Sequence, residues 1–451
     1  MQTKSNTFKS TIRRYVNGSV ILVFATLAAL VVANLPQTKE WYQEFCQMPV
    51  SVSIGKLKLF SHNGIPMTLG TFINDFLMAV FFLSVGLEIK REILCGELSN
   101  IKKAMLPIIG ACGGMLMPVL VYFVICTGDS VFDRGMAIPM ATDIAFSLGV
   151  LSIFNKRVPI GLKIFLAALA VADDLGGIIV IAIKYTEEIY TDYLLWAAGI
   201  IGVLMLGNLR GLHSKTFYLS LGFGLWYCML HSGIHATIAG VILAFCIPAD
   251  LGKGTKFYIE RIRYIVRQYP VIEVTHEDRH KAHVLSDEDI HNLRRIEVAS
   301  DHLISPLQDL EDSLKRPINF FIIPLFAFVN AGICFDGMGI DNLFSGVGLG
   351  VFLGLLVGKF TGILGISWLF MKLKIVQMPK NATWASFASI CMLCGIGFTV
   401  SMFIAELSFG PIHRTDLLND AKLGILCGTI ASAIIGSIML HFTLPKEDQE
   451  E

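Results

Sequence analysis

The sequence predicts an all-α polytopic membrane protein with about twelve transmembrane helices, two of them broken. Only 16% of the 451 residues are charged and 54% are hydrophobic, whereas soluble proteins carry about 25% charged residues. Apolar runs recur along the chain at the length of about 20 residues that crosses a bilayer. The formal net charge is zero, which gives no electrostatic basis for binding nucleic acid. We therefore expect a function inside the membrane.

The apolar runs fall into two regions separated by one polar insert. We expect transmembrane helices I–VIII within residues 1–249, a polar cytoplasmic insert at 250–316, and helices IX–XII with a C-terminal tail at 317–451. The runs lie near residues 12–33, 70–94, 104–126, 135–154, 160–184, 191–208, 215–230, 232–248, 317–335, 343–371, 383–407 and 421–443.

Basic residues indicate how the chain is oriented, because they gather at the N-terminus and in alternate loops. They are Lys9, Arg13, Arg14, Lys90, Arg91, Lys102, Lys103, Lys156, Arg157, Arg210, Lys215, Lys372, Lys374 and Lys380. The positive-inside rule then places both termini in the cytoplasm. Because no clear cleavage site follows the first apolar run, we interpret it as an uncleaved helix and not as a signal peptide.

One long loop, residues 48–63, alternates apolar and polar residues around Gly55 and Lys56. This pattern predicts a small β-hairpin on the periplasmic side. An isolated two-stranded hairpin is only marginally stable. A partner subunit could therefore cover its edge, and a hairpin lying on its own protein's surface is the alternative.

The polar insert predicts a solvated helical segment, because acidic and basic residues alternate along it. It also holds four histidines: His276, His280, His283 and His291. His276 and His280 have the spacing of a metal pair on a helix, but no third ligand is defined by spacing. Elsewhere, Cys391 and Cys394 form a CxxC motif without a second pair, so neither a zinc site nor a redox cofactor is expected.

Asp143, Asp173 and Asp174 lie within apolar runs and are the main candidates for a functional site. A carboxylate in the hydrocarbon region costs about 2.5 kcal/mol or more, so its presence indicates function. The adjacent Asp173 and Asp174 cannot both ionise in a low dielectric without a cation, and their protonation is coupled. Small hard cations such as Na⁺ or Li⁺ bind carboxylate, hydroxyl and backbone oxygens. Protons and such a cation would compete for the same oxygens, which predicts exchange.

Two apolar runs contain residues that interrupt a helix. Pro139 with residues 141–143 does so in the fourth run, and residues 394–399 do so in the eleventh. Helices broken at corresponding positions in two halves of a chain are typical of a transporter site. The non-helical backbone must then face protein or a cavity.

Lys359 lies in the middle of the tenth run. Half-helix ends carry partial charges of either sign, and Asp143 together with Lys359 could neutralise them. Lys359 could also form an ion pair with Asp173, or it could extend to the membrane surface.

Two further titratable residues lie near the ends of apolar runs. Glu88 shares a helix face with Glu92 and could guide cations at the cytoplasmic end, although a boundary carboxylate paired with a basic residue is an equal alternative. His235 could tune a response to pH, and its alternative is an interfacial histidine with satisfied hydrogen bonds.

Six segments, spread in order from the second to the eleventh run, resemble the NhaA family of bacterial Na⁺/H⁺ antiporters. They are INDFLMAVFFLSVGLEIKRE (73–92), AIPMATDIAF (137–146), AALAVADDLG (167–176), SGIHATIAG (232–240), PLFAFVNAG (324–332) and LCGIGFT (393–399). The resemblance implies two broken helices that cross at mid-membrane and inverted repeats, a described property of that family. It also implies pH-regulated export of Na⁺ or Li⁺ in exchange for H⁺, by alternating access, across the bacterial inner membrane.

The resemblance implies a role for several residues of this chain. Asp173 and Asp174 would bind the ion and carry the proton, and Thr142 would line the site. Asp143 and Lys359 would balance the charge where the broken helices cross. Because two titrating carboxylates per cation permit more than one proton per Na⁺, we expect electrogenic exchange.

The resemblance also bears on regulation and assembly. Glu88 and Glu311 fall where the family has its cytoplasmic pH-response cluster, and the hairpin at 48–63 falls where the family forms a homodimer. This chain departs from shorter members in an insert at roughly 252–300. It also has the sequence QDLED at 308–312 where the family has basic residues before its Glu.

Two other classes of function are less consistent with the sequence. A cation channel would use carboxylates, but a lysine in the same cavity and two broken helices disfavour it. A membrane aspartyl protease needs one Asp on each of two facing helices, whereas Asp173 and Asp174 are adjacent. We therefore expect a transporter and no enzyme activity.

Overall fold

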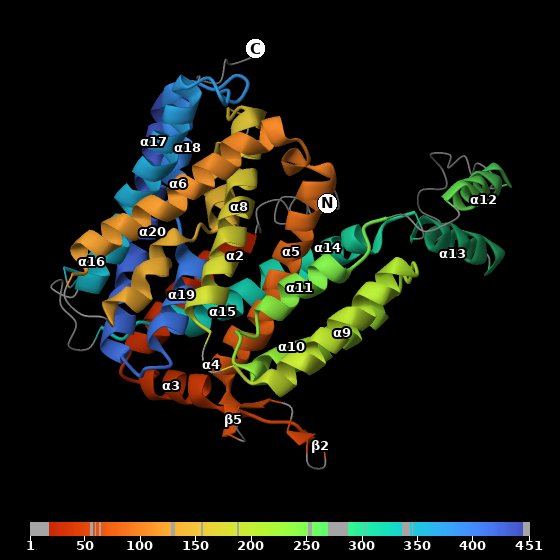
Figure 1. The fold of residues 1–451 in the computed structure, drawn as a ribbon, viewed down its shortest axis with the longest axis horizontal. Coiled ribbons are helices and arrows are strands. Elements are labelled where there is room, and N and C mark those ends of the chain that lie inside the picture. The colour runs from red at the N-terminus through yellow and green to blue at the C-terminus, as the bar shows by residue number, and fades with distance from the viewer. Residues whose placement is uncertain are drawn as a thin grey trace, which may run out of the picture.

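The computed structural model describes residues 18–54, 57–58, 60–62, 65–127, 131–154, 157–186, 189–250, 255–268, 287–301, 303–335, 343–344 and 346–444. Most of these residues form a bundle of long helices, and a few short strands lie beyond one end of the bundle (Figure 1). Two further helices stand outside the bundle (Figure 1). The prediction of a mainly helical chain is confirmed.

Most helices of the bundle follow the predicted apolar runs, but the helix Lys39–Gln47 lies between two runs and the helix Pro306–Pro317 lies in the predicted polar insert. Before the insert they are α2 (Gly18–Asn34), α3 (Lys39–Gln47), α4 (Leu69–Phe72), η1 (Ile73–Leu77), α5 (Met78–Cys95), η2 (Glu97–Ser99), α6 (Ile101–Ile125), η3 (Phe132–Met140), α7 (Ile144–Ile153), α8 (Ile160–Lys184), α9 (Thr191–Leu209), α10 (Lys215–Ser232) and α11 (Ile238–Cys246). After it they are α14 (Pro306–Pro317), η5 (Ile318–Ile322), α15 (Ile323–Asn330), α16 (Gly346–Leu353), η7 (Gly354–Gly358), α17 (Lys359–Lys372), α18 (Trp384–Leu393), α19 (Phe398–Phe409) and α20 (Thr415–Thr443).

When the helices of the structure are judged by length and hydropathy alone, fewer of them could span a membrane than the twelve predicted. Within the described residues, seven helices are long and apolar enough to cross a membrane, or nine if each of two bent helix pairs is one span. The runs near 215–230, 232–248 and 317–335 contain α10, α11 and α15, which fall short of that test. α11 has 9 residues because Gly233, at φ 84°, ends α10 and the next residues are not helical. Twelve spans and inverted repeats therefore remain predictions.

The predicted hairpin is part of a larger arrangement of strands. β2 (Ser53–Ile54) pairs antiparallel with β3 (Leu57–Lys58), which confirms a hairpin around residues 55–56. β5 (Ile65–Thr68) lies between β1 (Pro49–Val50) and β4 (Ser61–His62), also antiparallel. The strands thus extend past the predicted limit at residue 63. The sequence prediction missed β5 because Pro66 interrupts the pattern by which a strand is recognised.

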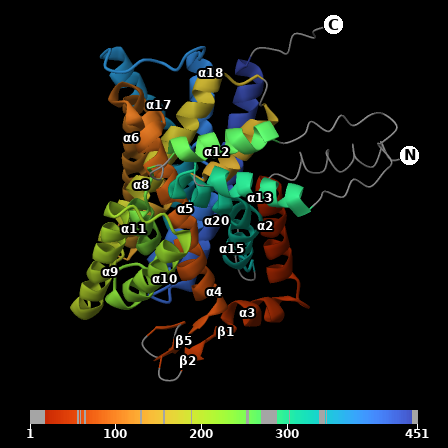
Figure 2. The ribbon, with the colours of Figure 1, turned by 90° about the vertical axis from the view of Figure 1, so that its right-hand side faces the viewer.

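The polar insert contains the helices α12 (Thr255–Gln268) and α13 (Asp287–Asp301), which pack on each other. Figure 2 shows them from a second direction. The later part of the insert behaves differently, since α14 continues through η5 into α15 and packs on α5. His276, His280 and His283 lie outside the described residues.

Candidate ion-binding site

The two breaks predicted from sequence contact each other in the structure. Residues 141–143 separate η3 from α7, and residues 394–397 separate α18 from α19, with a bend of 42° between the last two helices. The backbone N–H of Asp143 donates to the carbonyl oxygen of Ile396 at 2.7 Å. Each break therefore satisfies polar backbone groups of the other, which is the condition for non-helical backbone at membrane depth.

Asp143 joins the two breaks through its side chain. One carboxylate oxygen accepts from the backbone N–H of Phe146 at 2.9 Å, in the first turn of α7. The other accepts from the backbone N–H and the hydroxyl of Thr399, at 3.0 and 2.6 Å, in the first turn of α19. Helix N-termini carry partial positive charge and unsatisfied N–H groups. The buried carboxylate thus stabilises two helix N-termini at once.

Replacing Asp143 with Ala is expected to lower the free energy of unfolding by about 3–5 kcal/mol, because three donors lose a charged acceptor. Thr399→Val is the matched control, since it removes one hydroxyl and keeps the backbone donor; its expected loss is about 1.5–3 kcal/mol, the range for one hydrogen bond to a charged group. Thermal unfolding of the purified protein in detergent measures both. An Asp143→Ala variant as stable as Thr399→Val would contradict the double capping.

Lys359, Thr142 and Asp173 form a second buried group. The Lys359 ammonium donates to the Asp173 carboxylate at 2.5 Å and to the Thr142 hydroxyl at 2.9 Å. The Thr142 hydroxyl lies 2.8 Å from the same Asp173 oxygen and 3.0 Å from the carbonyl oxygen of Cys394, and it can donate to one of them at a time. Because the side chains of Lys359 and Asp173 have no exposed surface, extension of Lys359 to the membrane surface is excluded.

A π-helical turn, η7, positions Lys359 at the start of α17. Two glycines in η7 allow close packing: a Cβ on Gly354 would lie 2.7 Å from Cβ of Pro139, and one on Gly358 would lie 2.7 Å from Cα of Pro118. Side chains larger than hydrogen would push the lysine away from η3 and α6. Sequence reasoning missed this turn, because π-turns have no periodic signal of their own, although they are frequent at functional sites.

Asp173 and Asp174 both lie in the middle of α8 and are buried. One oxygen of each carboxylate, Oδ1, has no hydrogen-bond partner within the described part of the chain. Buried carboxylate oxygens are normally hydrogen-bonded, so these two are free to accept a proton or to contact a cation. No group of three or more His, Cys, Asp or Glu side chains in the described residues is arranged around a metal. A bound cation would therefore need hydroxyl or backbone oxygens as well.

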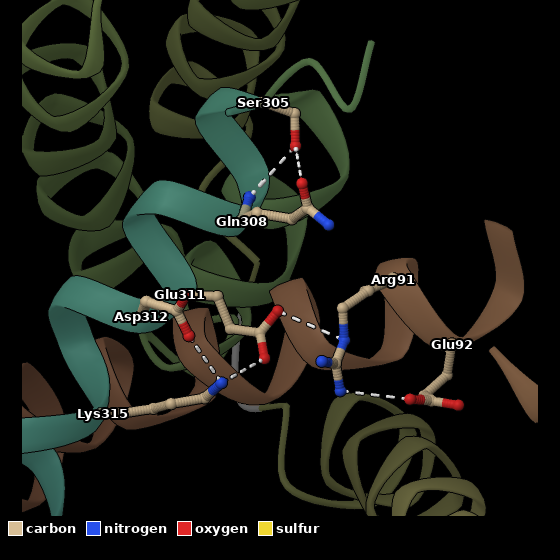
Figure 3. Close-up of polar contacts among 7 residues, drawn as sticks. All are labelled: Arg91, Glu92, Ser305, Gln308, Glu311, Asp312 and Lys315. Atoms are coloured by element: carbon tan, nitrogen blue, oxygen red, sulfur yellow. Dashed lines mark hydrogen bonds and ion pairs between the residues drawn. The ribbon is translucent and has the colours of Figure 1, made fainter. Parts of the chain in front are cut away.

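A cluster of charged side chains joins α5 to α14 at the ends of both helices (Figure 3). Arg91 Nε lies 3.4 Å from one oxygen of Glu311, and Lys315 Nζ lies 3.0 Å from the other. Arg91 also pairs with Glu92 at 3.1 Å, and Glu88 is half-buried one turn earlier on α5. The structure thus brings Glu311 next to the helix that carries Glu88.

Lys315 was missed by sequence reasoning, although its i+4 spacing from Glu311 is a usable signal. It also pairs with Asp312 at 2.8 Å. Burial lowers the pKa of Lys315, but the hydrogen bonds to Asp312 and Glu311 and the charges of these carboxylates raise it more, so its pKa lies above 10.5. The lysine therefore stays charged throughout the physiological pH range and supplies the base that the 308–312 segment lacks.

His235 lies apart from this cluster. It precedes α11, and its ring contacts the Thr237 hydroxyl at 3.0 Å and packs edge-on against Phe403. The opposite end of α11 is the one near α14, since the backbone N–H of Leu307 donates to the carbonyl of Pro248 at 3.2 Å. Glu88 and Glu311 thus lie near one end of α11, close to each other. His235 lies at the opposite end, in a different part of the bundle.

Comparisons with known proteins agree with the resemblance noted in the sequence. A family model described as Na⁺/H⁺ antiporter 1 matches residues 9–440. A Bacteroides thetaiotaomicron protein named Na(+)/H(+) antiporter NhaA is 51% identical over 431 residues, which are 95% of each chain. Proteins of the same name from Bacteroides fragilis and Escherichia coli O139:H28 are 50% and 40% identical, over 96% and 95% of this chain and 96% of each relative.

Proposed function

The chain belongs to the Na⁺/H⁺ antiporter 1 family, and from this membership we propose that it exchanges Na⁺ for H⁺ across a membrane. In the site, the observation that carries the proposal is the adjacent buried pair Asp173 and Asp174, each with one oxygen that lacks a hydrogen-bond partner within the described residues. The channel alternative has no support, since the relatives are named antiporters. Nothing indicates an enzymatic activity.

The proposed exchange follows from competition for the same oxygens. In the structure Lys359 holds one oxygen of Asp173, and the Oδ1 atom of each carboxylate, without a hydrogen-bond partner in the described residues, is open to either ion. Na⁺ or Li⁺ would bind when both carboxylates have lost their protons, with the Thr142 hydroxyl or backbone carbonyls completing its shell. Proton binding then neutralises the carboxylates and releases the cation. If the site opens to one side of the membrane at a time, export of Na⁺ is coupled to entry of H⁺.

We expect the exchange to be electrogenic, because two carboxylates can take up more than one proton for each Na⁺ released. In proteoliposomes, a membrane potential that is negative on the side receiving the protons should accelerate exchange. Dequenching of a pH-sensitive dye on addition of Na⁺, Li⁺ or K⁺ measures the rate. Vesicles without protein are the control, and rates that ignore the imposed potential would contradict the prediction.

The proposed location is the bacterial inner membrane, with both termini in the cytoplasm. The apolar helices support a multi-pass protein, and the basic loops support the orientation. The first residues and the last ones lie outside the described part of the chain. We also propose a homodimer in which the hairpin at 48–63 pairs with a second copy, because strand edges favour such pairing. Loss of an intersubunit cross-link after removal of β2 and β3 would support it, and an unchanged cross-link would refute it.

We further propose that the cluster of Arg91, Glu311 and Lys315 sets the pH response, together with Glu88. The support is geometric: α5 carries Arg91 and Glu88, and the same helix packs against α8, which carries the aspartate pair. A change of charge in the cluster would therefore affect ion binding at the aspartate pair, because α5 contacts both the cluster and α8. The role of His235 in pH response remains a prediction, and its separate position gives it no support from this cluster.

Glu311→Gln tests this role, because it leaves Arg91 and Lys315 with one negative charge fewer. An uncompensated unit charge about 10 Å from a hydrated cation changes the free energy of binding of that cation by about 0.4 kcal/mol, which is about twofold in affinity. The apparent KM for Na⁺ should rise by that factor. Because the lost negative charge weakens proton binding to the aspartate pair in the same way, the half-maximal pH measured at low Na⁺ should move downward. Asp309→Asn, whose partner is Lys215, is the control. An unchanged pH profile in Glu311→Gln would refute the proposal.

A further inference from the structure

The insert helix α12 presents an unusual pattern of side chains on the side away from α13. At about 100° per residue, Lys256, Arg263 and Arg267 form one stripe along the helix, with the exposed Glu260 as its single acid. All three side chains are exposed. The opposite side of α12 packs on α13, where Ile265 is only 3% exposed. The basic stripe is therefore held outward by the pairing of the two helices.

Large apolar side chains flank the basic stripe on both sides. Phe257 and Tyr264 lie on one flank and are 60% and 59% exposed. Ile259 and Val266 lie on the other flank and are 43% and 56% exposed. Soluble surfaces rarely carry four such side chains beside three basic ones, whereas helices that rest on a membrane surface combine the two. Basic groups bind lipid phosphates there, and apolar groups enter the headgroup region.

The covalent connections of the insert keep α12 near the bilayer. Eight residues, 247–254, separate α11 from α12, and a chain of that length spans at most about 28 Å. The insert returns to the same place, since the backbone N–H of Leu307 donates to the carbonyl of Pro248. Lys90 donates to the carbonyls of Phe245 and Ile247, so a charged side chain marks the end of α11. The insert thus starts and ends where the bundle meets the aqueous phase.

We propose that α12 docks through Lys256, Arg263 and Arg267 on the anionic phospholipid surface of the membrane in which the bundle is embedded, with Phe257, Tyr264, Ile259 and Val266 entering the headgroup region. The charge of the stripe decides the occupant, because it complements anionic headgroups and would repel the same stripe on a second copy. With Glu260 on the same face, the stripe carries a net charge of +2, which should favour the docked state on an anionic surface by on the order of 30-fold at low salt. The attraction should fall as salt shortens the Debye length.

Hydrogen–deuterium exchange of the full-length protein in lipid nanodiscs tests this docking. Peptides covering residues 255–268 should exchange at least about tenfold more slowly in discs of phosphatidylcholine mixed with phosphatidylglycerol than in discs of phosphatidylcholine alone. The difference should shrink near 1 M salt, where the Debye length is about 3 Å. Peptides of the bundle, such as those of α8, should be unaffected and report that the protein is folded.

Variants make the test specific to the stripe. The triple variant K256Q/R263Q/R267Q should lose the lipid-dependent difference, and E260Q, which removes the exposed acid of the same face, should enlarge it. R294Q, which removes an exposed base on α13, should leave it unchanged. Equal exchange in both lipids, or protection in detergent that rises with protein concentration, would overturn the proposal, the latter in favour of a second copy. If the triple variant fails to fold, the lipid and salt dependence of the unmodified protein still decides.

Discussion

Asp174→Asn will abolish Na⁺/H⁺ exchange while the protein still inserts and folds. The amide keeps the size of the carboxylate but binds no proton and carries no charge, so one of the two competing sites is lost. Interactions with a charged group contribute about 1.5–3 kcal/mol, and the upper end of that range corresponds to a loss of roughly 100-fold in affinity. Because Asp174 has no ion-pair partner within the described residues, folding should be affected little.

Asp173→Asn should also stop exchange, but with this variant the loss of exchange is harder to separate from a loss of stability. It removes the partner of Lys359, whose side chain has no exposed surface, so stability falls as well. Asp416→Asn, which changes an exposed carboxylate paired with Arg414, controls for expression and insertion. Dye dequenching in vesicles measures exchange, and growth of an antiporter-deficient host in high Na⁺ measures function. Full Na⁺ tolerance with Asp174→Asn would refute the proposed role.

Lys359→Ala is expected to lower the stability as strongly as Asp143→Ala. It leaves the Asp173 carboxylate buried with the Thr142 hydroxyl as its only hydrogen-bond donor among the described residues, and breaking a buried ion pair in this way costs about 3–5 kcal/mol. Removing both charges together is much less harmful, because neither charge is then left without a partner. The double variant Lys359→Ala/Asp173→Asn should therefore unfold at a higher temperature than Lys359→Ala alone.

Comparing the single variants with the double variant isolates the free energy of interaction between Lys359 and Asp173. Thermal unfolding in detergent, followed for all three variants at one pH, gives the interaction energy. Lys380→Ala, which removes an exposed lysine, controls for the loss of one positive charge. If the effects of the two single substitutions simply add, Lys359 and Asp173 do not stabilise each other, and the ion pair is not what holds the start of α17 near α8.

The class of the protein and its family could be recognised from sequence because both depend on local patterns. Apolar runs of membrane length, three carboxylates inside such runs and six motif segments are each readable within about 20 residues. The helix breaks were likewise predicted at Pro139 with residues 141–143 and at residues 394–399, and the structure has breaks at 141–143 and 394–397, because α19 already begins at Phe398. Glycine, proline and threonine limit backbone conformation wherever they occur, so no distant contact is needed to expect a break.

Three features could not be predicted because they depend on contacts between distant parts of the chain. Asp143 caps a helix whose first turn lies 256 residues away, so its double role exists only once the two breaks meet. Arg91 on α5 approaches Glu311 on α14, a helix far away in the sequence. β5 is recognisable only by the strands on either side of it.

The sequence by itself determined that this chain is a membrane protein with charged groups at membrane depth, because hydropathy and charge are properties of each residue. The tertiary structure decided which charges face each other. Lys359 could have neutralised a helix end, reached the surface or paired with an aspartate, and it contacts Asp173 across 186 residues. That choice depends on how closely η7 packs against Pro118 and Pro139, and packing between helices is set by the shapes of surfaces that form only on folding.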